Sequence, residues 1–309
     1  MTGAVLLALL PIVILTALGL ALRRRGFLAE GFWPQAERLG YFVLLPSLFF
    51  HGLATARIEA VPVGALALTL ILSTLAVAVL VIVLRPCLRL DGPAFTSVFQ
   101  GSVRFNNYVG VTLAAGLFGP QGIALAAICN AAIVPTVNIL CVLVFARHGT
   151  VRLTPRGIAR QLATNPLVVS SLGGILVQGL GLGIPPGLEP ALRALGAASL
   201  PLGLLCVGAA LDFGTARHWA GPVLAASTMK FVAMPAATVL AALCLGLHGP
   251  ALTTALLFQV LPTASSAYIL ARQLGGDAPL MAGITAAQTV LALVAMPLVL
   301  IALAAWVPL

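Results

Sequence analysis

The chain consists of long apolar stretches separated by short polar gaps. A membrane-spanning helix needs about 20 mainly apolar residues, and by this criterion the 309-residue sequence contains ten candidate spans. They cover residues 3–22, 34–55, 62–84, 93–117, 121–146, 163–180, 190–211, 219–245, 250–271 and 278–306. The longest gap runs from Arg147 to about Leu162 and is too short for a soluble domain. The pattern predicts an all-α polytopic membrane protein with ten transmembrane helices.

Composition supports this prediction and excludes several classes of protein. Hydrophobic residues make up 61% of the chain and charged residues only 7%, whereas soluble domains carry about 25% charged residues. An ordinary soluble enzyme, a disordered chain and a fibrous chain are therefore excluded. The net charge of +9 is spread over the gaps between apolar runs, so we expect a lipid bilayer and no nucleic acid as partner. The five cysteines form no metal-binding spacing, and we expect no metal, no cofactor and no catalytic residue.

The arginines predict the orientation in the membrane. Arg23, Arg24 and Arg25 follow the first span directly, which is typical of a retained segment whose N-terminus lies outside. Eleven arginines lie in the loops after odd-numbered spans, against Arg57 and, just inside the seventh span, Arg193. Because cytoplasmic loops are enriched in Lys and Arg, we expect both termini outside.

Two weak correspondences suggest an internal repeat. Leu45-Pro46 is matched by Leu200-Pro201, and Tyr108 is matched by Tyr268, at similar separations. We therefore predict a first repeat over residues 1–147, a cytoplasmic linker over 148–162 and a second repeat over 163–309. Five spans is an odd number, so the two halves must insert with opposite orientation. Inverted repeats are typical of transporters, which bind substrate near the midplane between discontinuous helices.

Spans four and nine contain polar runs that predict such discontinuous helices. Span four includes Gln100, Arg104, Asn106, Asn107 and Gly110, and span nine includes Gln259, Pro262, Thr263, Ser265 and Ser266. A span that is only structural stays apolar and helical, because lipid offers no hydrogen bonds; the alternative is a kink with interhelical hydrogen bonds. We expect the helices to break at Pro46, Gly110, Pro201 and Pro262.

Two cations lie in the middle of spans, Arg104 in span four and Lys230, the single lysine, in span eight. A central Arg or Lys costs at least about 2.5–3.5 kcal/mol on insertion scales, and such residues are functional by default. Every acidic residue lies at a span end or in a loop, so neither cation has an obvious carboxylate partner. They either bond to carbonyls at a helix break or bind an anionic substrate, and a buried lysine can also be neutral. The absence of carboxylates inside the spans argues against carboxylate-driven proton antiport and favours uniport or proton-linked movement of an organic anion.

The remaining polar residues of the spans are candidates for the substrate pathway or for ion coupling. Packing between helices is the competing interpretation, above all for His51, Asn130 and Asn138. The pathway set is His51, Gln100, Asn130, Asn138, Gln259 and Tyr268. The expected substrate-binding set is Arg104, Asn106, Asn107, Tyr108, Lys230, Pro262, Thr263, Ser265 and Ser266.

At these residues the chain resembles the bacterial branch of the auxin efflux carrier family, which includes plant PIN-type carriers and bacterial malonate and malate carriers. The resemblance rests on Arg-Phe-Asn-Asn-Tyr-Val-Gly-Val at 104–111 and Leu-Phe-Gly at 117–119. It also rests on the stretch from Leu-Pro-Thr-Ala-Ser-Ser-Ala-Tyr to Gly-Gly-Asp at 261–277. Many members have a Gly-x-Pro motif after the span-four Asn, where this chain has Gly110-Val111-Thr112.

The resemblance implies crossed broken helices four and nine, a scaffold domain and a transport domain, an elevator mechanism and a homodimer in the bacterial inner membrane. The function it implies is secondary transport of a small organic anion, a carboxylate or an auxin-like acid, by alternating access. Asn106 or Asn107 corresponds to the family's site Asn, and Pro262 to its span-nine Pro. The alternative is a sodium-coupled symporter of the bile-acid carrier type; a channel and an intramembrane enzyme are more remote.

Overall fold

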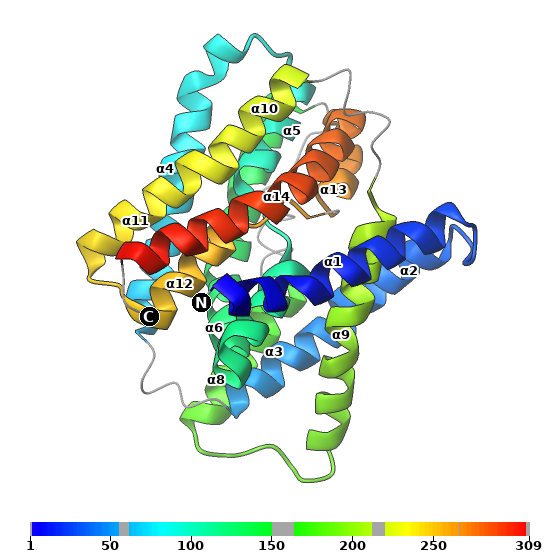
Figure 1. The fold of residues 1–309 in the computed structure, drawn as a ribbon, viewed down its shortest axis with the longest axis vertical. Coiled ribbons are helices and arrows are strands. Elements are labelled where there is room, and N and C mark those ends of the chain that lie inside the picture. Colours follow the sequence, from blue (N-terminus) through cyan, green and yellow to red (C-terminus); the bar gives the residue numbers. More distant parts are fainter. Residues whose placement is uncertain (1, 56–61, 150–163, 212–219, 265, 307–309) are drawn as a thin grey trace. The chain divides into compact units, whose positions relative to one another are not determined.

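The computed structural model describes residues 2–55, 62–149, 164–211, 220–264 and 266–306, and within these ranges every regular element is a helix (Figure 1). The predicted site residue Ser265 lies outside the described residues. The helices in the first part of the chain are α1 (Thr2–Arg24), α2 (Phe32–Leu39), the π-helix η1 (Gly40–Leu44), α3 (Leu45–Ala54), α4 (Val63–Leu88), α5 (Gly92–Val103) and α6 (Asn107–His148). They are followed by α8 (Pro166–Gly179), α9 (Glu189–Ala209), α10 (Ala220–Thr228), the π-helix η4 (Met229–Ala233), α11 (Met234–Leu245), α12 (Gly249–Gln259), α13 (Ser266–Leu274) and α14 (Ala278–Trp306).

Five helical stretches among the described residues are long and apolar enough to cross a membrane. They are Val63–Leu88, Gly92–His148, Glu189–Ala209, Ala220–Leu245 and Ala278–Val299. The broken helices α12 and α13, of 11 and 9 residues, are each too short to meet the length criterion alone. The structure therefore supports a multi-pass helical membrane protein, whereas the number of ten spans and the inverted repeat stay predictions.

The chain forms two compact units that are interleaved in sequence. Unit 1 comprises Met1–Val63, Asn107–Ala131 and Ala163–Ala210, and unit 2 comprises Gly64–Asn106, Ala132–Leu162 and Leu211–Leu309. Each unit thus takes segments from both halves of the sequence. The boundaries of the compact units differ from those of the predicted repeats. The two divisions answer different questions, so the predicted repeats stay untested by the compact units.

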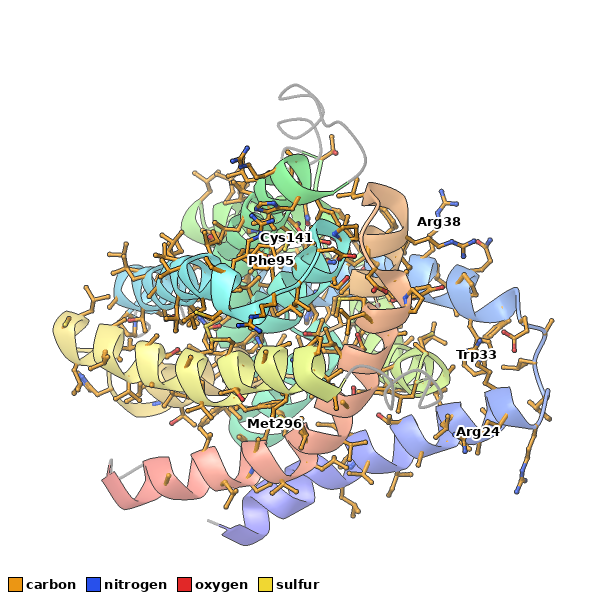
Figure 2. All side chains as sticks on the ribbon, turned by 90° about the horizontal axis from the view of Figure 1, so that it is seen from above. Arg24, Trp33, Arg38, Phe95, Cys141 and Met296 are labelled. Atoms are coloured by element: carbon orange, nitrogen blue, oxygen red, sulfur yellow. The ribbon has the colours of Figure 1, made fainter. Side chains whose placement is uncertain are left out.

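Unit 1 is assembled around α9. Helices α1, α2 and α3 all pack against α9, and α8 packs against α3 (Figure 1). In α2, Trp33 and Ala36 are buried against Cys206 and Ala209 of α9, while the side chain of Arg38 extends away from the ribbon (Figure 2). This division of α2 into an apolar and a polar face is the pattern of a helix that covers a core.

Unit 2 is assembled around α5, which packs against α10 and α14. The carboxylate of Asp91 caps α5 by accepting from the backbone N–H of Ala94 at 2.8 Å, and Asp277 caps α14 in the same way at Leu280, at 2.9 Å. Aspartate at the N-cap satisfies a backbone donor that a helix leaves free. Phe95 and Cys141 are fully buried in this unit, among the densely packed side chains of Figure 2.

The two π-helical turns each precede a proline. In η1 the backbone N–H of Leu45 bonds to the carbonyl of Gly40, just before Pro46, and in η4 that of Met234 bonds to Met229, just before Pro235. A proline inside a helix clashes with the carbonyl four residues earlier, and the wider turn accommodates it. Pro46, which we expected to break its span, therefore follows a π-helical turn inside continuous helical structure.

Two further expected breaks are wrong. Gly110 lies inside α6 and Pro201 lies inside α9, and both stretches are helical. Isolated glycines and prolines are tolerated in membrane helices when the freed backbone groups find other partners. The sharp turn of α6 occurs instead at Gly119, which has φ 57° and ψ −137°. Only glycine adopts this conformation readily, and Gly119 ends the Leu-Phe-Gly motif.

Candidate functional site

The first break in unit 2 separates α5 from α6. Helix α5 ends at Val103, Arg104 has an extended backbone (φ −76°, ψ 160°), and α6 begins at Asn107. Phe105, 6% exposed, anchors the break because its ring packs against that of Phe258 on α12, with 5.8 Å between the centroids. Asn106 is also buried. The polar run of span four therefore contains a helix interruption, four residues earlier than Gly110.

The second break separates α12 from α13. Helix α12 ends at Gln259, and residues 260–264 are not helical. Pro262 lies in this segment, where its missing N–H prevents a helical hydrogen bond. Thr263 is fully buried, and α13 begins at Ser266. The start of α13 presents backbone N–H groups that have no partner within the helix.

Gln288, on α14, connects the two breaks. Its Oε1 accepts from the backbone N–H of Thr263 at 3.1 Å and from the Thr263 hydroxyl at 2.7 Å. Its Nε2 donates to the carbonyl of Gly101, in the last turn of α5, at 2.9 Å. Gly101 and Gln288 thereby fix the end of α5 and the middle of the second break relative to each other. The sequence interpretation missed Gln288, although an amide inside the apolar span 278–306 is the signal that identified Gln100 and Gln259.

Gln100 makes a second link between the same segments. Its Nε2 donates to the carbonyl of Ala267, in the first turn of α13, at 3.4 Å and lies 3.8 Å from the Met281 sulfur. Its Oε1 has no hydrogen-bond partner among the described residues. Because buried polar atoms usually have a hydrogen-bond partner, Gln100 Oε1 is a candidate to accept a hydrogen bond from a ligand or a water molecule.

Arg104 is paired within the protein, which the sequence interpretation did not anticipate. Its Nη1 donates to Oδ1 of Asn138, on the part of α6 that belongs to unit 2, at 3.1 Å. The guanidinium also lies beside the thiol of Cys141. Both partners are neutral, so the guanidinium charge has no carboxylate at this place in the described structure. Arg104 is half-buried, and its remaining donors can reach a ligand.

Lys230 is fully buried in η4, and its Nζ has no hydrogen-bond or ion-pair partner among the described residues. Helix η4 packs against α5. One turn before Lys230, Ala226 lies so close to Gly101 that a Cβ on that glycine would approach the Ala226 Cβ to 3.1 Å. The lysine therefore lies on the helix that contacts α5 just before the first break.

Gln259 occupies a buried polar cluster with α4. Its Nε2, which carries two hydrogens, lies within hydrogen-bond distance of Ser73 Oγ at 2.8 Å, Thr74 Oγ1 at 3.0 Å and the carbonyl oxygen of Leu70 at 3.1 Å. These bonds hold the end of α12 against α4. The Gln259 amide nitrogen is used in packing, and its Oε1 has no partner among the described residues; a role in the pathway stays a prediction.

The other expected site residues differ in their place along the chain. Asn107 follows the first break directly, as the first residue of α6, whereas the others lie inside helices. Asn107, Tyr108 and Asn130 belong to unit 1. The Tyr108 ring packs directly on Gly203 of α9, where a Cβ would overlap it, and the Asn130 amide donates to the carbonyl of Ala126 on its own helix. Tyr268, on α13, is 37% exposed. The described residues contain no cluster of three or more His, Cys, Asp or Glu side chains that could hold a metal.

His51 also belongs to unit 1. Its Nε2 lies 3.7 Å from Oε1 of Glu189, at the start of α9. The expected substrate residues therefore separate into a group at the breaks and a group elsewhere. The group at or directly beside the breaks contains Arg104, Asn106, Asn107, Pro262, Thr263 and Ser266, and Lys230 lies on η4, which packs against α5.

Comparison with known proteins agrees with a transport role. The profile of a family described as "Membrane transport protein" matches residues 4–300. The chain is 26% identical over 250 residues, covering 76% of this chain and 75% of the other, to a protein of Rhizobium meliloti (strain 1021) named "Putative malonate transporter".

Proposed function

The chain belongs to the membrane transport protein family, as its resemblance to auxin efflux carriers predicted, and on this premise we propose that it is a secondary transporter of a small organic anion. The proposed binding site lies at the two helix breaks of unit 2. Carboxylates are the proposed substrates, and the R. meliloti relative's name makes malonate the first compound to test.

The observation that carries this proposal is the buried lysine. Lys230 has no counter-charge among the described residues, and an uncompensated cation in a membrane interior is costly and by default functional. Among the described residues, Arg104, at the first break, donates to the neutral amide of Asn138 and lies beside the thiol of Cys141. An anion bound between the breaks would compensate these charges, which favours its entry into a low-dielectric site.

The breaks add a second source of anion affinity. Helix α13 begins at Ser266, directly after the second break, and the free N–H groups and dipole of a helix start attract negative charge. Gln100 already holds this helix start through the carbonyl of Ala267. The dipole at the start of α13 and the two cations, Arg104 and Lys230, are the groups expected in a site that binds a carboxylate.

The transport cycle follows from charge compensation. An empty site would expose Lys230 and Arg104 to a low dielectric, whereas a loaded site is closer to neutral and moves at lower cost. Unit 2 holds both breaks, so it is the candidate for the mobile part in the elevator motion that the family resemblance implies. A homodimer in the bacterial inner membrane, with both termini outside, completes the proposal.

The test is uptake by purified protein in liposomes. We expect saturable uptake of radiolabelled malonate that unlabelled di- and monocarboxylates inhibit to different degrees, and loss of uptake in Lys230→Met. Absence of saturable uptake of every carboxylate in the panel would contradict the proposal. Replacing sodium by potassium in the same assay identifies a sodium-coupled symporter, and single-channel currents above carrier turnover would identify a channel.

A further inference from the structure

Unit 1 contains a cavity that is separate from the residues of the two breaks. It has a volume of about 700 Å³ and lies between α3, α9 and the part of α6 that follows the Gly119 turn. This is within the range of about 300–1,000 Å³ found for small-molecule sites. All of the residues that line it belong to unit 1.

One edge of the cavity is charged. His51 on α3 and Arg193 on α9 both line it, and Glu189 lies one turn before Arg193 on the same helix. The His51 Nε2 is buried and has no hydrogen bond among the described residues, since Glu189 Oε1 lies 3.7 Å away, beyond hydrogen-bond distance. A contact of this length leaves the imidazole able to bond a closer carboxylate.

The walls of the cavity are mostly apolar. Side chains from all three helices form them, with Gln121 and Thr55 as further polar groups. The apolar side chains include Leu48, Ile123, Leu192, Ala197 and Leu200. An apolar wall with a few polar groups at one edge is the usual composition of a site for an amphipathic small molecule.

We propose that this cavity is a second binding site, for amphipathic monocarboxylates that have an apolar body. The carboxylate lies between the guanidinium of Arg193 and the imidazole of His51, where it takes the place of the Glu189 carboxylate. The apolar body lies against the leucine and isoleucine wall. Malonate, a three-carbon diacid, has no apolar body to fill this wall and binds here weakly. Binding at this site requires no transport and does not depend on the function proposed for unit 2.

Photolabelling of the full chain in lipid nanodiscs tests the proposal. The probe is an octanoate analogue with a diazirine near the end of its alkyl chain, and the matched control is the corresponding alcohol. We expect the carboxylate probe to label peptides from residues 45–55, 119–124 or 189–200. Excess octanoate should abolish this labelling, and equal malonate should leave it in place.

Variants distinguish specific binding through His51 and Arg193 from non-specific binding to an apolar surface. The double variant His51→Gln/Arg193→Gln should reduce labelling at least tenfold, and Ala197→Phe should reduce it by filling the cavity from α9. Arg38→Gln is the matched control, because Arg38 is an exposed arginine on α2 that does not line the cavity; its labelling should equal that of the wild type.

Equal labelling by the alcohol, full labelling of the double variant, or no labelling in these peptides would each overturn the proposal. Thermal unfolding identifies a variant that fails to fold. If the double variant fails to fold, the labelling of Ala197→Phe, which changes no charge, tests the proposal instead. Malonate uptake by the wild-type protein in liposomes tests unit 2 separately. Failure of uptake with retained labelling of the wild type would contradict only the function proposed for the breaks.

Discussion

The Thr263 hydroxyl donates a 2.7 Å hydrogen bond to Oε1 of Gln288, and the Thr263 backbone N–H donates to the same oxygen at 3.1 Å. One amide oxygen thus accepts both donors of a residue in a helix break. The amide nitrogen of Gln288 bonds to Gly101 at the end of the other helix before a break. These three bonds hold the two interrupted helices of unit 2 in one geometry.

Replacing Gln288 by Leu should therefore destabilise the protein and reduce transport. The Thr263 N–H would lose its partner in a buried place, and an unsatisfied buried group costs about 1–3 kcal/mol. The Gly101 carbonyl would keep the Thr263 hydroxyl, which lies 3.1 Å away. We expect the free energy of unfolding to fall by about 1–3 kcal/mol on that basis, together with a loss of carboxylate uptake. Gln35→Leu, at an exposed position of α2, is the control. Wild-type stability of Gln288→Leu would show that the three bonds contribute nothing.

The contact between Arg104 and Asn138 can be measured with a double-mutant cycle. Both residues are in unit 2, and the guanidinium donates to the amide oxygen at 3.1 Å. Pairs in direct contact show coupling energies of about 0.5–3 kcal/mol. Arg104→Gln, Asn138→Leu and the double variant should therefore be non-additive in substrate affinity. Additive effects would mean that Asn138 does not position Arg104 for the substrate.

Lys230→Met should separate stability from function. The side chain is fully buried without a partner among the described residues, so removal of the amine relieves a desolvation cost of at least about 2.5–3.5 kcal/mol for the charged form. We expect thermal unfolding in nanodiscs at the same or a higher temperature, and uptake below a tenth of wild type. Lys230→Arg, which keeps a cation, is the matched variant. Full uptake by Lys230→Met would show that the lysine does not bind substrate.

Gly203→Ala should destabilise unit 1. The Tyr108 ring lies directly against Gly203, where a Cβ would overlap it, and overpacking of a filled core costs about 1–3 kcal/mol. We expect a lower unfolding temperature. Gly221→Ala on α10, where a Cβ meets nothing within 4 Å, is the control; alanine is the better helix former, by up to about 1 kcal/mol. Equal effects of the two substitutions would contradict the packing found at Tyr108.

The sequence by itself predicted the helical class, the family and the two helix interruptions, because these follow from the nature of neighbouring residues. Lipid cannot bond a free backbone, so polar runs with Asn or Pro inside an apolar span indicate a break wherever they occur. Asn106 and Pro262 are such residues, and both lie in the interruptions that the structure contains. Gly110 and Pro201 carry the same local signal, yet their helices continue, since helix neighbours decide whether a glycine or proline is tolerated.

Only the tertiary structure decided which polar side chains are free and which are paired. Arg104 and Lys230 are equivalent in the sequence, both being cations in the middle of spans. The fold places Asn138, 34 residues away along the chain, within 3.1 Å of Arg104, and leaves Lys230 alone among the described residues. Gln288 likewise acquires its role through contacts with Gly101, 187 residues away in the sequence. Hydrogen bonds over such separations depend on helix packing, which a pattern of apolar and polar positions does not encode.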